Sequence, residues 1–569
     1  MFQYANKALI AAAFLILAIV IIPIVLVPEA MVAAIGQVYN FITTDMAWLY
    51  LLIGFGMAVG AIVLLTTKFG DIRLGGRNAK PHYKTFTWIA MNLCSALAAG
   101  ILIFGMCEWM YYVTGTPFGI EPYSVQAYEY ASAYGMFHWG FSAWAFYLVA
   151  GVAIGYLYWN KKIGDLRISA LCSNLIGGDS KGKKIFRWVL DAIMVFCYFM
   201  AMMTTVGIGT PVMGELASNL LGIENTFALK IGIIIIFCLF FTLSTSKTIA
   251  KGMGRISDFN VWLAIAFFIF VLIVGDTSFI LNNIVMAIGT NIREFVRMSF
   301  NSDAVAQTGF VQNWTIFYWA WYVALTFMCG LWIARTSYGR TFREITVANC
   351  IWAVLACWVT FGILGNYGMG QELFHGQNFS SVIGEVGNNG VTLLVLQTMP
   401  LPKLCIFVFM ILIFFNLATS ATANGTALSM YTSKGLKADE EPNSWYKTFW
   451  CVLFMIIPVG ILLLEHNVEG LNVLSTIQSL ITISSLPVLV ALVVLFWSFG
   501  KVLRKDISDG TIRQYVDKSK ESKWGNEHER KIRKRRCHMD TAVLPHQQLF
   551  GRWQTGSCVS GGKNTERIL

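Results

Sequence analysis

The chain has 569 residues, of which 56% are hydrophobic and only 13% are charged, and its mean hydropathy is +0.61. A soluble globular protein carries about twice that share of charged residues, so the composition excludes the ordinary soluble class. The formal net charge of +11 could indicate a nucleic-acid partner, and the positions of the basic residues along the chain test this interpretation.

Hydrophobic runs that are long enough to cross a bilayer repeat along the chain. A helix needs roughly 20 residues to span the hydrocarbon core. We predict twelve such runs, at about residues 8–28, 47–67, 86–113, 134–158, 187–210, 229–249, 258–280, 314–334, 348–366, 401–432, 448–465 and 474–499. The first run is too long, and is followed by too many others, to be a cleaved signal peptide. The sequence therefore predicts an all-α polytopic membrane protein with 12 transmembrane helices.

Basic residues gather in the loops that follow the even-numbered runs. The loop after the second run contains Lys68, Arg73, Arg77, Lys80 and Lys84. Among the loops after odd-numbered runs, only 281–313 has clear basic residues, Arg293 and Arg297. The positive-inside rule then places both termini in the cytoplasm of a multi-pass protein of the cell membrane. Membrane topology explains the charge, so we expect no nucleic-acid partner.

Two connections and the C-terminal end depart from the pattern of short loops. Residues 281–313 have apolar side chains at helical spacing, which predicts an amphipathic helix along the outer surface. Residues 367–400 are rich in Gly and Asn and predict an irregular outer cap. Residues 501–569 are polar and include a dense basic run at 530–536, so we expect a cytoplasmic tail. The tail is either a solvated topogenic segment or a surface that docks on anionic lipid.

The remaining composition offers little chemistry for catalysis. None of the cysteines falls in a predicted external loop, which argues against a disulfide framework. We find no CxxC motif, no Cys/His cluster of the kind that binds a metal, no pairing of nucleophile and base, and no cofactor motif. The sequence therefore predicts a protein that is not an enzyme and that has no cofactor.

Residues 313–322 place a strip of aromatic side chains at the head of the eighth run. Trp314, Tyr318 and Trp321 follow i, i+4, i+7 spacing, so in a helix they share one face. A lipid-facing helix would use Leu and Ile there, and interfacial Trp usually occurs in ones and twos. Several rings on one face suit a cage whose π-clouds hold a quaternary ammonium cation. For any one ring alone, core packing or interfacial anchoring is the alternative.

The same strip resembles the signature of the betaine/carnitine/choline transporter family. It reads Asn313-Trp-Thr-Ile-Phe-Tyr-Trp-Ala-Trp321, and Tyr322 follows where the family has a second consecutive Trp. The resemblance continues in the basic loop Ile333-Ala-Arg-Thr-Ser-Tyr-Gly-Arg-Thr-Phe-Arg-Glu344. Further matches are Phe137-His-Trp-Gly140 and Thr116-Pro-Phe-Gly119. The similarity covers about residues 8–500 and leaves the tail uncovered.

The resemblance implies a fold of two inverted five-helix repeats, spans 3–7 and 8–12, preceded by two extra helices. The chain would then divide into the extra helices at 1–85, the first repeat at 86–280, the outer connecting helix at 281–313, the second repeat at 314–500 and the basic tail at 501–569. Such repeats hold the substrate near the membrane midplane, where broken helices free backbone groups. The stretch from Gly100 to Gly105 is a predicted place to unwind. Relatives form trimers, so the resemblance also implies a homotrimer.

The resemblance also assigns the substrate-binding rings. The cage maps onto Tyr111, Trp139, Trp144, Tyr147 and Trp321, and an outer vestibule maps onto Trp314, Tyr318 and Tyr322. In a regular helix, Trp139 and Trp144 would share one face only loosely. Tyr322 keeps a π-face and adds a hydroxyl, so we expect altered affinity or selectivity rather than loss of transport.

Three ionisable residues lie inside predicted spans. Glu108 and Asp191 interrupt apolar runs, where carboxylates are costly and function is the first suspicion. We interpret both as structural hydrogen-bonding groups and keep proton carriage as the alternative. His138, next to Trp139, is interpreted as a packed, hydrogen-bonded residue, although an imidazole titrates near neutral pH.

Energy coupling is predicted from a comparison with two patterns within the family. Sodium-coupled relatives use adjacent Thr and Ser hydroxyls, which map onto Thr419 and Ser420, whereas exchangers place an Arg in the same space. Here Asn260 stands where that Arg would fall, and Cys329 replaces the exchanger's pocket Met. Hard oxygen ligands without a resident cation suit Na⁺ as the coupling ion. Exchange without Na⁺ and coupling to protons remain alternatives.

These features together predict a secondary active transporter that imports a quaternary ammonium compound by Na⁺ symport. Glycine betaine, carnitine and choline all fit an aromatic cage, and the purpose is either osmoprotection or catabolism. The alternatives are a Na⁺-independent antiporter of the carnitine/γ-butyrobetaine type and a membrane sensor that binds such a ligand without moving it.

Overall fold

The computed structural model of the chain describes residues 4–97, 100–244, 253–436, 440–467 and 473–524. Within these ranges every regular element is helical. The β-type pairing there consists of two isolated antiparallel bridges, Ala5 with Ser433 and Arg73 with Thr341. The all-α prediction is confirmed. The basic run 530–536 and the anionic-lipid surface predicted for it lie outside the described residues.

The described residues up to Val274 form a series of α-helices. They are α1 (Lys7–Leu26), α2 (Pro28–Asn40), α3 (Ala47–Thr66), α4 (Thr85–Leu97), α5 (Gly100–Thr114), α6 (Val125–His138), α7 (Phe141–Gly155), α8 (Ile168–Leu171), α9 (Ser173–Ile176), α10 (Lys181–Leu221), α11 (Phe227–Ser244) and α13 (Met253–Val274). Short π-helical and 3₁₀ segments join them: η1 (Phe41–Asp45), η2 (Lys68–Asp71), η3 (Pro117–Gly119) and η4 (Tyr156–Asn160).

The second half continues in the same way. Its α-helices are α14 (Thr277–Phe300), α15 (Phe317–Thr336), α16 (Phe342–Val347), α17 (Ala353–Thr360), α18 (Asn366–His375), α19 (Phe379–Gln397), α20 (Pro402–Tyr431), α21 (Ser444–Asn467) and α22 (Val473–Ser508). The shorter segments are η5 (Val311–Ile316), η6 (Ala348–Trp352), η7 (Phe361–Gly365), η8 (Thr511–Tyr515) and η9 (Lys518–Trp524). Each of the twelve predicted hydrophobic runs overlaps one or more of these helices.

Eight helical stretches among the described residues are long and apolar enough to cross a membrane. Two shorter apolar helices, Lys7–Ile19 and Phe227–Phe240, add to them. The polytopic, multi-pass character is therefore confirmed. The count of twelve spans and the pairing of the spans into inverted repeats remain predictions.

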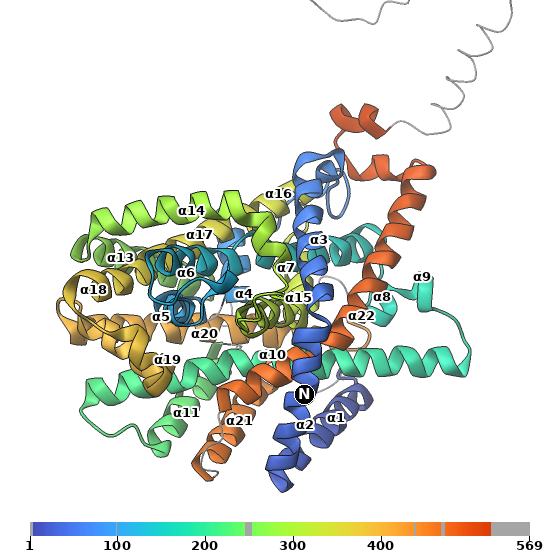
Figure 1. The fold of residues 1–569 in the computed structure, drawn as a ribbon. Coiled ribbons are helices and arrows are strands. Elements are labelled where there is room, and N and C mark those ends of the chain that lie inside the picture. Colours follow the sequence, from blue (N-terminus) through green and yellow to red (C-terminus); the bar gives the residue numbers. More distant parts are fainter. Residues whose placement is uncertain (1–3, 98–99, 245–252, 437–439, 468–472, 525–569) are drawn as a thin grey trace, which may run out of the picture.

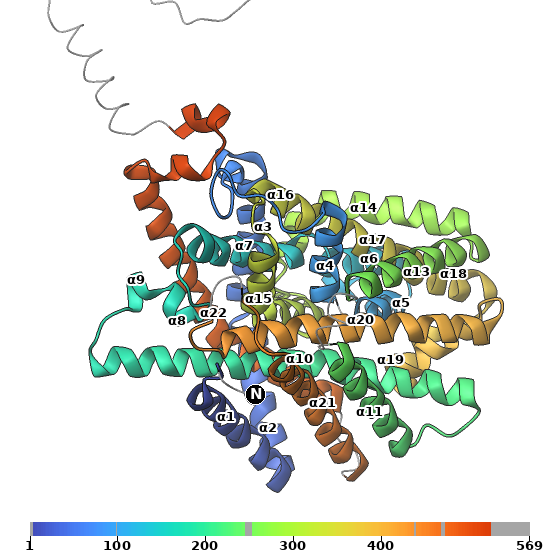
Figure 2. The same cartoon turned by 180° about the vertical axis from the view of Figure 1, so that it is seen from behind.

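Long helices pack side by side through the middle of the molecule. Figure 1 shows α10 and α20 running alongside each other, while α3 and α22 cross this layer at a steep angle. Helix α14 lies along one edge of the molecule in both views (Figures 1 and 2), where it packs on α6, α3 and α18. Helices α7 and α15 lie against each other along their lengths, and they bring the fourth and eighth predicted spans together.

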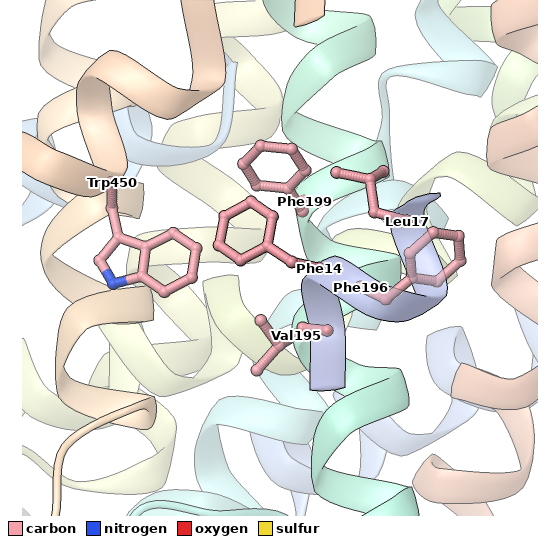
Figure 3. Close-up of a pocket in the computed structure, with 7 residues that line it drawn as sticks. Phe14, Leu17, Val195, Phe196, Phe199 and Trp450 are labelled. Carbon is pink, nitrogen blue, oxygen red and sulfur yellow. The ribbon is translucent and has the colours of Figure 1, made fainter. Parts of the chain in front are cut away.

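The N-terminal helix is held to the bundle by aromatic packing. Phe14 of α1 stacks on Trp450 of α21, with ring centroids 6.3 Å apart and planes at 4°, and meets Phe199 of α10 edge-on at 6.3 Å. Figure 3 shows these rings around a small apolar cavity. Its volume of about 10 Å³ holds at most one water, so this region is core packing rather than a ligand site.

Two local predictions are wrong. Residues 367–400 are not an irregular cap, because α18 and α19 cover most of that stretch and α19 packs on α5. Its chain bends at Gly387, whose φ of 63° and ψ of −175° belong to a region that only Gly adopts readily. The stretch from Gly100 to Gly105 does not unwind, since α5 begins at Gly100 and is helical throughout. Residues 98–99, between α4 and α5, lie outside the described residues.

The start of the polar tail is packed rather than free. Helix α22 continues to Ser508, and the following turns lie against the loop after α3, where the Arg73 N–H donates to the Tyr515 carbonyl at 2.7 Å. Asp71 accepts from Lys520 at 2.8 Å and from Arg343 at 2.5 Å. Burial raises the pKa of Asp71, but the hydrogen bonds and charges of Lys520 and Arg343 outweigh it and hold the pKa below its usual value.

Candidate functional site

A break in the fourth span places the first of the candidate rings. Helix α6 ends before Trp139 and α7 begins after Gly140, which has φ −94° and ψ −145°. A Cβ at Gly140 would lie 2.4 Å from the Met136 carbonyl oxygen, so the break requires Gly. The indole N–H of Trp358 donates to the same carbonyl at 2.9 Å and satisfies a group that the break frees. The break also explains why Trp139 and Trp144 fit one regular helix only loosely.

One face of α5 supplies the opposite wall. Gly100, Phe104, Glu108 and Tyr111 recur at i, i+4, i+8 and i+11, a spacing that aligns them along the helix. A Cβ added at Gly100 would make ordinary van der Waals contact with Trp139 at 3.5 Å and Trp321 at 3.7 Å, so this end of the face lies next to the two indoles.

The predicted aromatic residues form one continuous run of ring contacts. We call this set the ring cluster: Tyr111, Trp139, Trp144, Tyr147, Trp314, Tyr318, Trp321 and Tyr322. In its centre the Trp139 ring lies 5.5 Å from Tyr318 and 6.1 Å from Trp321, both near-perpendicular. Tyr318 stacks on Tyr322 at 5.8 Å with an angle of 22° between the planes.

The two ends of the cluster extend from this centre. On one side Trp314 lies 6.3 Å from Tyr318 and 5.1 Å from Tyr111. On the other side Tyr147 meets Tyr322 at 5.9 Å, and Trp144 meets Tyr147 at 6.0 Å. The structure thus places Tyr318 and Tyr322, which we assigned to an outer vestibule, beside Trp139 and Trp321 rather than apart from them.

A buried carboxylate anchors the centre of the cluster. Glu108 is fully buried and accepts the Trp139 indole N–H at 2.9 Å and the Tyr318 hydroxyl at 2.5 Å through one oxygen. Its other oxygen accepts the Tyr112 hydroxyl. Two rings of the cluster are therefore fixed by the same side chain, in agreement with the hydrogen-bonding role that we expected for Glu108.

His138 extends this network on the side of α6. Its Nδ1 lies 2.7 Å from the Tyr112 hydroxyl and its Nε2 lies 3.0 Å from the Thr315 hydroxyl. The His138 backbone carbonyl accepts the Tyr322 hydroxyl at 2.9 Å. The hydroxyl that distinguishes Tyr322 from the family's Trp thus has a defined partner next to the break between α6 and α7.

One polar atom of the central rings has no partner within the described part of the chain. The Trp321 indole N–H is buried and meets no acceptor there. A buried donor without an acceptor costs about 1–3 kcal/mol, so it calls for an explanation. The indole nitrogens of Trp332, Trp450 and Trp524 are also buried without a partner in the described residues, so this N–H alone does not identify a ligand site.

Sequence reasoning missed three residues that shape this region. Phe104 packs between Trp139, Tyr318 and Trp321 at 6.0, 6.2 and 6.4 Å, and its helical spacing to Gly100 and Glu108 is the signal that could have found it. Asn388 accepts the Tyr111 hydroxyl at 2.8 Å from α19, and Tyr112 bridges Glu108 and His138. No local pattern marks Asn388, because its partner lies far away in the sequence.

The predicted ion ligands lie on α20 in a different setting. Thr419 donates its hydroxyl to the carbonyls of Phe415 at 2.7 Å and Asn416 at 3.1 Å. The Ser420 hydroxyl oxygen accepts from the Asn424 amide at 3.1 Å. A hydroxyl that donates to a carbonyl still has lone pairs, so both oxygens fit an alkali cation. The resemblance also places backbone ligands of the ion around Leu97 and Ala98 in the third span, and Ala98 lies outside the described residues.

The two residues assigned to coupling are both buried. Asn260 lies on α13, and its neighbour Phe259 packs edge-on against Phe415 of α20 with centroids 6.0 Å apart. The side-chain oxygen of Asn260 has no donor in the described ranges. Helices α4, α13 and α20 pack on one another, so Asn260 belongs to the same helix trio as Thr419. Cys329 is buried on α15, seven residues after Tyr322.

The second intramembrane carboxylate has a separate, local set of partners. Asp191 of α10 accepts the Ser169 N–H at 3.1 Å, the Ser169 hydroxyl at 2.6 Å and the Tyr431 hydroxyl at 3.2 Å. These bonds tie α8 and α20 to α10. Asp191 therefore has the structural hydrogen-bonding role that we expected.

Comparison with known proteins agrees with this architecture. The model of the betaine/carnitine/choline family of transporters matches residues 8–508. The chain is 29% identical over 456 residues to a protein named uncharacterized transporter YeaV from Escherichia coli (strain K12), which covers 80% of this chain and 92% of that relative. It is also 29% identical over 460 residues to a protein named carnitine transporter from Acinetobacter baumannii, which covers 81% of this chain and 80% of that relative.

Proposed function

Because the chain belongs to the betaine/carnitine/choline family of transporters, we propose that it carries a quaternary ammonium compound across the membrane. Membership makes it a multi-pass membrane transporter and not an enzyme. The observation that carries the proposal is the ring cluster, in which Trp139, Tyr318, Trp321 and Tyr322 contact one another and a carboxylate accepts hydrogen bonds from two of them.

The chemistry of the cluster favours methylated ammonium over other cations. A quaternary nitrogen has no N–H to donate, so it gains more from π-faces than from hydrogen-bond acceptors. The orphaned Trp321 N–H adds a donor for an oxygen on the same ligand. A carboxylate, as in glycine betaine and carnitine, or a hydroxyl, as in choline and carnitine, would satisfy it.

Uptake into proteoliposomes tests this proposal directly. The labelled compounds to test are glycine betaine, L-carnitine and choline. At least one of them should accumulate inside the vesicles, and unlabelled tetramethylammonium should compete with its uptake. Binding to the vesicles without accumulation would instead support the alternative of a membrane sensor. No accumulation and no binding of any of the three compounds would reject the proposal.

We further propose that Na⁺ drives uptake by symport. Thr419 and Ser420 supply hard oxygen ligands, and Asn260 leaves the neighbouring space without the fixed positive charge that exchangers place there. The bound ion would supply that charge. A Na⁺-independent antiporter is the second candidate, because the Thr419 and Ser420 hydroxyls already have hydrogen-bond partners that stabilise α20 without an ion.

A Na⁺ gradient separates the two coupling schemes. Symport predicts that an inward gradient stimulates uptake into empty vesicles, and that Na⁺ tightens substrate binding by the same factor by which substrate tightens Na⁺ binding. Uptake that ignores Na⁺ but requires internal substrate would establish exchange. The variant Asn260→Arg should shift a symporter toward Na⁺-independent exchange, since a guanidinium replaces the charge of the ion.

A further inference from the structure

The carboxylate behind the ring cluster has a specific charge balance. Trp139, Tyr318 and Tyr112 each direct one polar hydrogen to Glu108, so its oxygens act as acceptors only. Because Tyr112 gives its single hydroxyl hydrogen to Glu108, its contact with His138 at 2.7 Å needs the hydrogen on Nδ1 of the imidazole. The Nε2 atom then accepts from the Thr315 hydroxyl at 3.0 Å.

Every polar hydrogen in this network has an acceptor when Glu108 is ionised and His138 is neutral. Each of the three polar neighbours of Glu108 can direct a hydrogen at one of its oxygens, which is the arrangement that an ionised carboxylate requires. Among the described residues, the ionisable base within 4 Å of Glu108 is His138, at 3.8 Å, and neither Lys nor Arg approaches it. With the hydrogens in these positions, the network holds a net negative charge in the centre of the protein.

A buried negative charge with no cation beside it is not required to hold the rings of the cluster in place. Holding two rings in place requires hydrogen-bond acceptors, and a neutral amide oxygen supplies these at a much lower desolvation cost. Asp191, the other carboxylate in the spans, has Arg167 at 3.9 Å as well as its hydroxyl donors. Glu108 lacks such a cation, and the π-faces next to it also favour positive charge.

We propose that Glu108 is the resident counter-charge of the substrate site. It orients the Trp139 and Tyr318 rings and attracts the ammonium group that lies between them, and it makes the site prefer ligands with a net positive charge over neutral ligands of the same shape. This inference rests on the proposed function, and it assigns the charge selectivity of the site to one side chain.

The preference follows from Coulomb's law in a desolvated site. A cation on the face of Trp139 lies within roughly 6 Å of the ring centroid, and Glu108 bonds to the edge of the same indole. At such separations an ion pair shielded from water is strong enough to change affinity ten-fold or more. A zwitterion gains less, because its own carboxylate is repelled by the same charge.

Three probes of similar shape separate charge from framework. Choline carries one positive charge, glycine betaine is a zwitterion, and 3,3-dimethylbutan-1-ol is the uncharged carbon isostere of choline. Binding of each is measured by tryptophan fluorescence with purified full-length protein and its Glu108→Gln variant. We expect choline to bind about ten-fold or more weakly to the variant, 3,3-dimethylbutan-1-ol to change less than about two-fold, and glycine betaine to fall in between.

Controls make the outcome decisive. Asp191→Asn removes another buried carboxylate, away from the ring cluster, and should leave the ratio of choline to 3,3-dimethylbutan-1-ol affinity unchanged. If Glu108→Gln does not fold, Glu108→Asp keeps the charge but withdraws it by one methylene, and the ratio should fall about three-fold. Equal weakening of all three probes, or no change in the ratio, would show that Glu108 only supports the framework and would overturn the inference. A wild-type protein that binds none of the probes would reject the proposed function itself, and the inference with it.

Discussion

The ring cluster and the hydroxyl pair on α20 are two buried regions that differ in how they are built. The rings come from three separate parts of the chain: α5, the segment around the break between α6 and α7, and η5 with α15. Two of them, Trp139 and Tyr318, are held by Glu108 from another helix, α5. Thr419 and Ser420 are adjacent in one helix and bond mainly within it. The cluster is therefore rigid through tertiary contacts, whereas the hydroxyl pair is shaped locally and depends on other helices to become an ion site.

This difference has a functional consequence for the proposed transport. A site assembled from several helices responds whenever those helices move relative to one another, which suits a substrate site that opens and closes. A site on one helix responds through that helix and whatever packs on it, here α4 and α13. The helix contacts offer direct routes between the two regions, because α20 packs on α15 and also on α10 and α19, which both contact α5.

The largest effect is expected from Trp139→Leu. The change removes a ring from the centre of the cluster and leaves the Glu108 oxygen without one of its donors. A desolvated cation–π contact is worth about 2 kcal/mol, so substrate affinity should fall about 30-fold. Competition uptake measures it, and Trp352→Leu, at an exposed Trp, is the matched control that should keep wild-type affinity. An unchanged affinity in well-expressed Trp139→Leu protein would remove the ring cluster from the substrate site.

The hydroxyl pair is tested by Thr419→Ala. If this oxygen binds Na⁺, the Na⁺ concentration for half-maximal uptake should rise about ten-fold, which corresponds to roughly 1.4 kcal/mol, while substrate affinity at saturating Na⁺ changes little. Thr426→Ala removes a hydroxyl that back-bonds in the same helix at 2.8 Å and serves as control. Equal effects of both substitutions would indicate that the hydroxyls only stabilise α20.

A smaller effect is expected from Tyr322→Phe. This variant keeps the ring stacked on Tyr318 but loses the hydrogen bond to the His138 carbonyl. A buried hydrogen bond contributes about 0.5–1.5 kcal/mol, so affinity should fall about five-fold, with the Na⁺ requirement unaffected. Titration of uptake against substrate and against Na⁺ gives both values. A changed Na⁺ requirement would show that the two regions are coupled through α15 more tightly than the contacts suggest.

The smallest effect is expected from a truncation outside both regions. Removing residues 525–569 leaves the packed turns up to Trp524 intact, so affinity and Na⁺ requirement should stay within about two-fold of wild type. Removing residues 511–569 also deletes the buried side chains of Ile512, Val516 and Trp524, and it should lower the melting temperature by several degrees. Thermal melting in detergent compares the two truncations. If the protein that lacks only residues 525–569 does not fold, the tail beyond Trp524 is part of the core.

The amino-acid sequence was sufficient to predict the class of the protein and which aromatic residues form the ring cluster. Apolar runs of the right length predict membrane helices because the bilayer leaves backbone groups no other way to bond. The i, i+4, i+7 spacing of Trp314, Tyr318 and Trp321 is a local property of a helix, so it could be read directly. The rings of the other helices were reached by resemblance.

The contacts between these rings could be found only from the tertiary structure. The break at Gly140 depends on Trp358 from another helix, Asn388 reaches Tyr111 from a distant one, and Glu108 becomes an anchor because three donors converge on it. The packing of residues 512–524 on the loop after α3 was likewise invisible in a polar sequence. Periodicity reports only neighbours within one helix, whereas these contacts join residues far apart in the chain.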